Sequence, residues 1–397
     1  MPEAQFGFLR ELLAAPSPIG LEGAMTNGVL APRIQAFMPK GWTLHRFRGN
    51  AGLVADTAPD RPEAFSVMAI GHADKIRLQV RSIGDDGKIW VNSDSFLPCT
   101  LLGHEVLLYC ENPKSPGKWR LLRGGTIEAI GAIHFADNEL RAGRKGITPE
   151  MLFLELQVHG DEKRKQVEAL GVRAGDPILL DRPIRRGFSK DTFVGAYLDN
   201  GLGCFVVAEA LRLLAEGKGL RNIRFLGAFA AYEEIGRMGS RVLAQEFEPD
   251  VVIGVDVAHD FAAAPGVGDK RFTPNAMGKG FTLASGSIVS AQLNTLFAQV
   301  ATERGIPLQH KVVGRDTGTD AMAGVFASID AAATSIGFPI RNMHTISEAG
   351  HTGDLLAAVH ALVGVLEKLD GMHKGTGARA EDFRAGHPRL DQAAPLS

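Results

Sequence analysis

The chain has 397 residues, with 43 lysines and arginines against 45 aspartates and glutamates, and a formal net charge of -2. This near balance argues against nucleic-acid binding, which normally uses a basic surface. Hydrophobic residues make up 45% and charged residues 22% of the chain, which excludes a mainly disordered protein. At roughly 150 residues per domain, the length suggests two or three domains.

Neither a membrane nor an oxidising compartment is indicated. No apolar run approaches the roughly 18 residues of a membrane helix, and the acidic N-terminus lacks the features of a signal peptide. Cys99, Cys110 and Cys204 are odd in number and form no Cys-x-x-Cys pair. We therefore expect a reduced, cytoplasmic protein without a disulfide framework.

The first elements are a helix and two strands. Apolar residues at helical spacing over 6–15, ending before Pro16, predict a short amphipathic helix. Residues 53–55 and 66–70 read as short buried strands. The second strand runs directly into the sequence Gly71-His72-Ala73-Asp74.

The character of the chain changes over residues 79–187. Short β-rich pieces alternate with turns there, and one helical stretch, at about 162–170, interrupts them. This pattern predicts a small β-rich domain inserted within a larger one. The β-rich pieces are 88–91, 105–109, 126–130, 152–158 and 177–180.

Buried strands and helices alternate after residue 187. Strands are predicted at 223–230, 251–255 and 333–336, and helices at 203–214, 291–303, from about 320, and at 354–369. This alternation predicts an α/β fold with a doubly wound, mostly parallel sheet. Its domain would comprise residues 1–78 and 188–370. Residues 371–397, rich in Gly, Ala, Pro and charge, are expected to form a loose tail.

Five short segments carry histidines or carboxylates just past predicted strands or at a helix start. They are His72-Ala73-Asp74, Asp199-Asn200, Glu233-Glu234, Asp256 and His344. In an open α/β sheet, ligands gather at the carboxyl ends of the strands, so these segments can converge. Nitrogen and oxygen donors together suit Zn²⁺, Co²⁺ or Mn²⁺. The histidines at 104, 134, 159 and 310 fall outside these segments and are expected to be structural.

Taken singly, most of these segments also have an ordinary structural explanation. Asp199 could cap a helix, and Glu233-Glu234 could be a solvated acidic turn. Asp256 differs because it lies among valines, where an unpaired carboxylate is costly to bury. The combination and order of the segments are therefore more informative than any single segment.

Seven stretches follow one another in the order of a known family. They are Leu12–Gly23, Gly71–Asp74, Tyr197–Gly203, Tyr232–Gly236, Gly254–Val257, Gly318–Ala321 and Pro339–Glu348. This set resembles the tetrahedral aminopeptidases, two-metal metallopeptidases that include glutamyl aminopeptidases and proteins with a cellulase-M-like or endoglucanase label. The resemblance extends to about Leu369. It implies that the inserted β-rich domain is a PDZ-like dimerisation or assembly module.

The resemblance also implies two divalent metal ions per chain, with zinc favoured and cobalt or manganese as alternatives. Asp199 would bridge the two ions. Glu234 and His344 would complete one site, and His72 and Asp256 the other, which leaves each ion an open position.

The expected catalytic residues are Glu233 and Asp74. By the same resemblance, Glu233 would be the general base that deprotonates a metal-bound water. Asp74 would not bind a metal ion itself but would hold the ligand His72 in place. Because successive residues of an extended chain point apart, Glu233 and Glu234 are not expected to bind the same ion.

The activity implied is that of an aminopeptidase acting on short peptides, in a homo-oligomer built from dimers and, in this family, reaching dodecamers. The chain departs from the family at Lys75 and Arg77, where a glutamate and a glycine are usual, and at Asn342 and Thr345, which replace a tyrosine and a serine. These changes remove no ligand, but the two added positive charges could alter the field of the site and its substrate preference.

Two other functions compete. One is an N-acyl amino-acid deacylase or carboxypeptidase on the same fold, and the insertion directly after the His72 segment argues against it. The other is a catalytically idle homologue kept for assembly or peptide binding. Retention of all five ligands and of Glu233 argues against that alternative.

Overall fold

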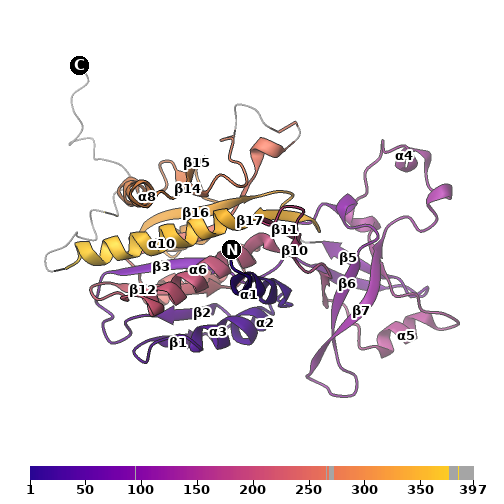
Figure 1. Cartoon of the computed structure of the whole chain (residues 1–397). Coiled ribbons are helices and arrows are strands. Elements are labelled where there is room, and N and C mark those ends of the chain that lie inside the picture. Colours follow the sequence, from indigo (N-terminus) through magenta and orange to yellow (C-terminus); the bar gives the residue numbers. More distant parts are fainter. Residues whose placement is uncertain (94, 265, 268–271, 375–382, 384–397) are drawn as a thin grey trace.

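The computed structural model describes the whole chain except residues 94, 265, 268–271, 375–382 and 384–397 (Figure 1). Most of the predicted tail, 371–397, therefore lies outside the described residues. Where that segment is described, the last helix continues to Met372. Within the described residues, none of the helices combines the length and apolarity needed to span a bilayer.

The centre of the molecule is an eight-stranded sheet in the order β1-β2-β12-β3-β13-β16-β14-β15. Neighbours among β12, β3, β13 and β16 pair in parallel, whereas β2 and β14 pair antiparallel to this group. The strands are β1 Thr43–Arg46, β2 Gly52–Asp56, β3 Ser66–His72, β12 Arg224–Ala230, β13 Val251–His259, β14 Phe281–Ser285, β15 Leu308–Val312 and β16 Ala332–Ile340. The predicted mostly parallel sheet is confirmed.

Helices cover both faces of this sheet. Along β3, Val67 and Ala69 pack into one core and Met68 and Ile70 into another, because successive strand residues face opposite sides. The first core is covered by α1 Glu3–Ala14, α3 Ala31–Gln35, α6 Leu198–Glu216, α8 Ala291–Arg304 and α10 Thr352–Met372, and the second by α7 Met238–Phe247 and α9 Ala323–Phe326. The fold is therefore doubly wound, as predicted.

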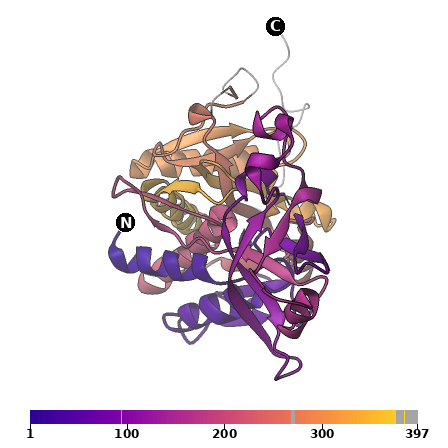
Figure 2. The same cartoon turned by 90° about the vertical axis from the view of Figure 1, so that its right-hand side faces the viewer.

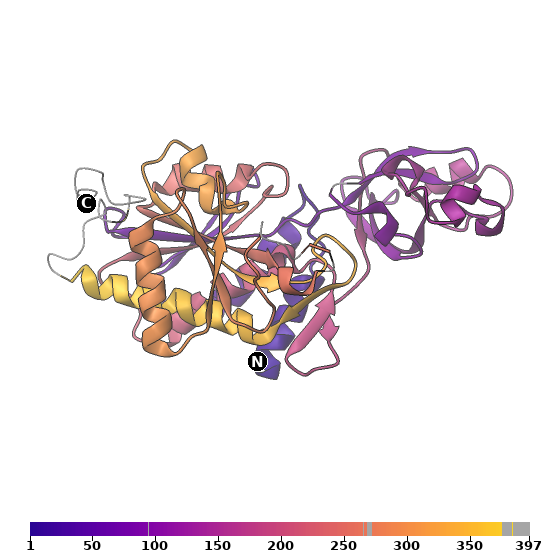
Figure 3. The same ribbon diagram turned by 90° about the horizontal axis from the view of Figure 1, so that it is seen from above.

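The inserted module is a closed barrel that projects to one side of the α/β body (Figures 1 and 3). Its six strands pair antiparallel throughout, in the order β4-β5-β8-β7-β6-β9. They are β4 Leu78–Ile83, β5 Ile89–Ser93, β6 Glu105–Glu111, β7 Trp119–Glu128, β8 Phe153–Glu155 and β9 Pro177–Leu180. Closure leaves no unpaired sheet edge among the described strands of the module.

In the described residues of the inserted module there are two short α-helices where the sequence predicts one. The predicted helix is α5, Lys163–Ala169, and the additional helix is α4, Asn138–Arg141. Four residues are too few to show helical periodicity, so the sequence pattern does not predict α4. Figure 2, viewed from the side of the module, shows the barrel in front of the α/β body.

A three-stranded antiparallel sheet forms where the chain returns from the barrel to the body. Its strands are β10 Arg185–Arg186, β11 Thr192–Gly195 and β17 Glu348–His351. The remaining helical turns are α2 Gly23–Met25, a π-helix at Thr26–Leu30, and 3-10 turns at Pro98–Thr100, Ile133–Phe135, Pro149–Met151, Phe261–Ala263 and Asp320–Met322.

Candidate active site

The predicted site residues meet at the carboxyl ends of the four central strands. His72 ends β3, Glu233 and Glu234 follow β12, Asp256 lies within β13, and His344 is in the loop after β16. Asp199 enters from the start of α6. These strands are neighbours in the sheet, so residues far apart in sequence share one edge.

Asp199 lies between the two histidines. Its Oδ1 is 3.2 Å from Nε2 of His72, and its Oδ2 is 3.2 Å from Nε2 of His344. The neighbouring Asn200 anchors this segment, since its Nδ2 donates to Val255 O at 2.8 Å and its Oδ1 accepts Gly203 N–H at 2.8 Å. One carboxylate thus presents one oxygen to each imidazole.

Two groups of potential metal ligands share Asp199. His72, Asp199 and Asp256 form one, and Asp199, Glu234 and His344 the other, each with donor atoms within 4.8 Å of one another. Buried Asp199 Oδ1 and Glu234 Oε1 have no hydrogen-bond partner of acceptable geometry among the described residues, so their lone pairs are free for a cation. The donor set and these oxygens fit divalent metal ions.

The pKa shifts in the cluster also favour a metal site. Burial raises the pKa of Glu233 to about 9 and that of Asp256 well above its usual value, and neighbouring carboxylates add to both effects. Burial lowers the pKa of His344, but its contacts with Asp199 and Glu234 outweigh this and raise it to about 10. Without cations, Glu233 and Asp256 therefore hold their protons more tightly than usual, and bound metal ions would favour the loss of these protons.

Asp74 lies beside His72 and accepts hydrogen bonds from the acidic turn, Glu233-Glu234. Its Oδ1 lies 3.3 Å from Nδ1 of His72. In addition, its two oxygens accept the backbone N–H groups of Glu233 and Glu234, each at 3.1 Å. The contact with His72 was anticipated from the sequence, whereas the hold on the turn was not.

Glu233 and Glu234 face different histidines. Glu234 Oε1 is 3.6 Å from His344 Nε2, while Glu233 Oε2 is 3.8 Å from His72 Nε2. The other oxygen of Glu233 accepts from Arg237 Nε at 3.3 Å. Both carboxylate oxygens of Asp316 accept from Arg237 Nη1, at 2.8 and 2.9 Å. The positive charge of Arg237 is therefore shared between Glu233 and Asp316.

Comparison with known proteins identifies the family. The profile described as M42 glutamyl aminopeptidase matches residues 52–360. The chain belongs to this family. Lysyl aminopeptidase of Pyrococcus furiosus is 28% identical over 312 residues, which cover 78% of this chain and 83% of that protein. The predicted family and the predicted peptide-hydrolase activity of the aminopeptidase class are thereby confirmed.

Solved structures support the fold. The TET aminopeptidase of the marine sediment archaeon Thaumarchaeota archaeon SCGC AB-539-E09 superposes with a TM-score of 0.81 at 22% identity, covering 96% of this chain and 100% of that one. The TET1 peptidase of Pyrococcus horikoshii, described as assembling into a tetrahedron or a large octahedral shell, gives a TM-score of 0.73 at 21% identity, with 91% and 98% covered. At these identities the likeness concerns the fold alone.

This M42 chain also uses a buried carboxylate that the sequence did not single out. Glu348 accepts the N–H of Leu198 at 2.6 Å and that of His344 at 2.7 Å. Burial raises its pKa to about 8. Glu348 thus ties together the segments that carry Asp199 and His344. The sequence feature that could have indicated Glu348 is its position, four residues after the candidate ligand His344.

Lys311 is a second residue that sequence reasoning missed. It lies on β15 and lines the site pocket together with Val257, Ala258, His259 and Met343. Its Nζ is 3.4 Å from Thr317 O, and burial lowers its pKa. Nothing in the local sequence marks it, because only the packing of β15 against the sheet brings it there.

The charges at Lys75 and Arg77 are held by the N-terminal segment. The Lys75 ammonium donates to Leu13 O at 2.7 Å and to Ala15 O, at the end of α1. Arg77 Nη1 donates to Ile19 O at 3.0 Å. The buried Lys75 charge therefore faces a helix terminus, where cations are stabilised, rather than the site carboxylates. The effect of Lys75 and Arg77 on the field of the site and on substrate preference stays a prediction.

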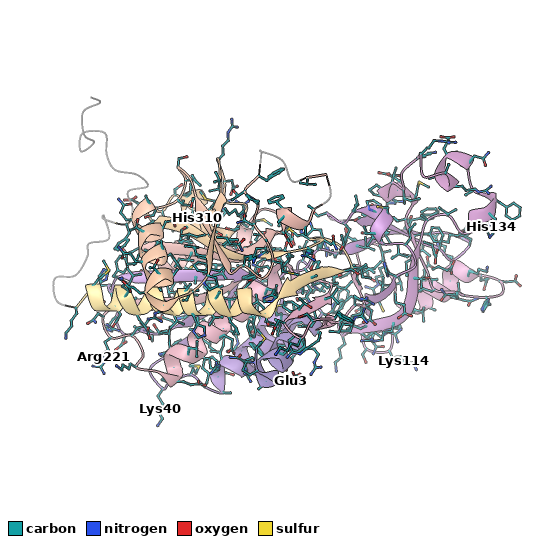
Figure 4. The ribbon with its side chains drawn as sticks, turned by 45° about the horizontal axis from the view of Figure 1, so that its top comes forward. Glu3, Lys40, Lys114, His134, Arg221 and His310 are labelled. Atoms are coloured by element: carbon teal, nitrogen blue, oxygen red, sulfur yellow. The ribbon has the colours of Figure 1, made fainter. Side chains whose placement is uncertain are left out.

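Asn342 and Thr345 bond within their own loop. Thr345 Oγ1 donates to Asn342 O at 2.8 Å, and Asn342 Nδ2 donates to Ser347 O at 3.3 Å. Of the histidines expected to be structural, His134 lies at the outer end of the barrel and His310 on the α/β body (Figure 4). His310 Nδ1 is 3.1 Å from Ser285 Oγ.

Proposed function

We propose that this chain is a two-metal aminopeptidase that removes N-terminal residues from short peptides. The observation that carries the proposal is the placement of Asp199, with one oxygen toward each histidine at 3.2 Å. Asp199 would bridge two ions. His72 and Asp256 would complete one coordination set, and Glu234 and His344 the other.

Divalent cations in such a site supply Lewis acidity, which polarises a substrate carbonyl and makes a water more acidic. Glu233 is the general base: it takes a proton from the attacking water and returns it to the leaving amine. Its contact with Arg237 holds one oxygen, so the other faces the His72 side of the pocket. Asp74 keeps both the histidine and the turn in place.

The expected metal is zinc, with cobalt or manganese as alternatives. Two imidazole nitrogens and several carboxylate oxygens form a donor set that suits these ions better than a thiolate site. Cys110 and Cys204 are buried and Cys99 is exposed, and none belongs to the two ligand groups. All three cysteines are free, which supports a cytoplasmic location.

A panel of aminoacyl anilides, each with a free and an acetylated N-terminus, tests the activity. We expect only the free forms to be cleaved, with loss of activity on chelation and recovery with Zn²⁺, Co²⁺ or Mn²⁺. The panel also gives the preferred N-terminal residue. Cleavage of acetylated substrates instead would show a deacylase or an endopeptidase. An inactive metal-loaded protein would leave a specialised substrate or an idle homologue.

We also propose a homo-oligomer built from dimers, with the barrel, taken as domain 79–187, as the assembly module. In support, the barrel projects from the body, and alternate residues Trp119 and Leu121 on β7 are 51% and 38% exposed.

Light scattering after size exclusion tests this assembly. We expect the double variant Trp119→Ser/Leu121→Ser to have a smaller mass than the native oligomer. Phe188→Ser, at an exposed aromatic residue outside the barrel, is the control and should leave the mass unchanged. A monomeric native protein would refute the proposal.

A further inference from the structure

The N-terminal stretch Leu12–Gly23 matches the family but contributes no residue to the two ligand groups. The one charged residue of this stretch is Glu22, which is 0% exposed. Glu22 Oε1 accepts the N–H of Gly20 at 2.9 Å, and its Oε2 accepts Asn50 Nδ2 at 2.5 Å. A carboxylate is costly to bury, so a fixed pair of donors on it indicates a specific task.

Asn50 connects the Glu22 carboxylate to the acidic turn, Glu233-Glu234. The same Nδ2 group also donates to Tyr232 Oη, at 3.2 Å. Tyr232 directly precedes Glu233 and Glu234 in the sequence. A chain of contacts therefore runs from Glu22 through Asn50 to the residue that opens the acidic turn.

Tyr232 needs such support because its backbone is unusual. Its φ is +58°, in the left-handed region that a bulky side chain rarely adopts. Such a conformation persists only where the surroundings determine it, and it is frequent at functional sites. Here it makes the turn that sends Glu233 and Glu234 toward different histidines.

The turn is held by two sets of contacts. Asp74 accepts the N–H groups of Glu233 and Glu234. In addition, the hydroxyl of Tyr232 accepts from Asn50, which is bonded to Glu22. The hold by Asp74 fixes the backbone of the two glutamates, and the hold by Asn50 fixes the residue before them.

We propose that Glu22 and Asn50 are positioning residues for peptide hydrolysis: they hold Tyr232 and thereby aim the Glu233 carboxylate for proton transfer. This inference rests on the proposed function, because it concerns the general base. Small displacements of a catalytic group lower turnover more than ground-state binding, so the effect falls on kcat rather than KM.

The decisive test exchanges the hydrogen-bond donor and acceptor of the Glu22–Asn50 pair. Asn50→Asp places a second carboxylate against Glu22 and removes the amide donor, so we expect kcat to fall about 10-fold or more, with KM within about 2-fold. In the double variant Glu22→Gln/Asn50→Asp, the amide introduced at position 22 donates to the carboxylate introduced at position 50 and still accepts the N–H of Gly20. That carboxylate then accepts the Tyr232 hydroxyl. We expect kcat to recover to within about 3-fold of the native value.

Two further variants make the test specific. Tyr232→Phe removes only the hydroxyl and should lower kcat by about 3- to 10-fold without loss of bound metal. The matched control is Thr57→Val, which deletes one hydroxyl bonded to Phe225 N–H at 2.9 Å, at the opposite end of β12. It should leave kcat unchanged even where the melting temperature falls.

The outcomes separate the two proposals. A native enzyme that cleaves no peptide refutes the proposed function itself. With an active native enzyme, an unchanged kcat in Asn50→Asp refutes the positioning role. So does a double variant that regains its melting temperature but not its kcat, since that describes a merely structural pair. If Asn50→Asp does not fold, the double variant and Tyr232→Phe decide by the same criteria.

Discussion

The α/β body and the barrel differ in how many of their charged side chains are buried. The body buries a dense set of ionisable groups along one sheet edge, including His72, Asp74, Asp199, Asp256 and Glu348. In the part of the barrel that the structure describes, Asp176 is the one buried charged side chain. The barrel core is otherwise apolar, drawn from strands such as β5, β7 and β9.

Charge in the barrel remains at the surface. Its ion pairs, such as Arg164 with Glu168 and Arg144 with Glu139, join exposed side chains and add little stability. Lys114 and His134 project from the module in the same way (Figure 4). The barrel is thus held by apolar packing, whereas the body keeps buried charges that packing alone would not retain. Their concentration at one edge is what marks the site.

The largest effect is expected from Asp199→Ala. Loss of the shared carboxylate should release both metal ions and lower kcat/KM at least about 1000-fold. Asp176→Asn is the matched control, because Asp176 is also buried but accepts a local N–H, from Arg173 at 2.8 Å. Elemental analysis of dialysed protein gives the metal content. An Asp199→Ala protein that still holds two ions per chain would contradict the bridging role.

Glu233→Gln should separate metal binding from turnover. The variant should retain its metal content while kcat falls about 100- to 10,000-fold, because the amide cannot accept the proton. Glu234→Gln, one residue away, should instead weaken metal binding at the His344 side. Full activity in Glu233→Gln would exclude it as the base.

The buried cluster also predicts the pH dependence of stability without metal. The folded-state pKa values of Glu233, Glu348 and His344 are raised to about 9, 8 and 10, so all three stabilise the fold at low pH. That stability is lost as pH rises through these values. Lys75 opposes them, since burial lowers its pKa to about 7.

We therefore expect the melting temperature of chelator-treated protein to fall by about 5 °C or more between about pH 6 and pH 9. Added Zn²⁺ should largely remove this dependence, because the metal replaces the protons. Differential scanning fluorimetry measures both conditions. A melting temperature that rises with pH in the chelated protein would show that the cluster does not control stability.

The smallest effect on activity is expected from the barrel core. Ile127 on β7 is fully buried, so Ile127→Ala should destabilise the chain by about 2–5 kcal/mol in urea unfolding. Activity per folded molecule should stay within about 2-fold at low temperature. A large loss of kcat there would show that the barrel and the site are coupled.

Much of this architecture could be predicted because its signals are local. The buried runs at 66–70 and 251–255 predicted strands, and the ligand candidates followed from their positions at strand ends. The relation of His72, Asp199 and His344 came from a family resemblance, since spacing alone does not bring them together. Asp256 was marked by a carboxylate among valines.

Other features depend on tertiary packing and left no local trace. Lys311 reaches the pocket only because β15 joins the far edge of the sheet. The hydrogen bonds from the acidic turn to Asp74 depend on the parallel pairing of β3 and β12. Lys75 looked like a charge near the site, but its side chain turns toward the end of α1. The direction of a side chain is set by neighbours that the sequence does not name.

The most direct test of the two-metal site is anomalous diffraction from crystals of the native protein loaded with Zn²⁺ or Co²⁺. We expect two anomalous peaks per chain, one on each side of the Asp199 carboxylate, the first near His72 and Asp256 and the second near Glu234 and His344. A single peak, or peaks that do not touch Asp199, would contradict the two-metal site.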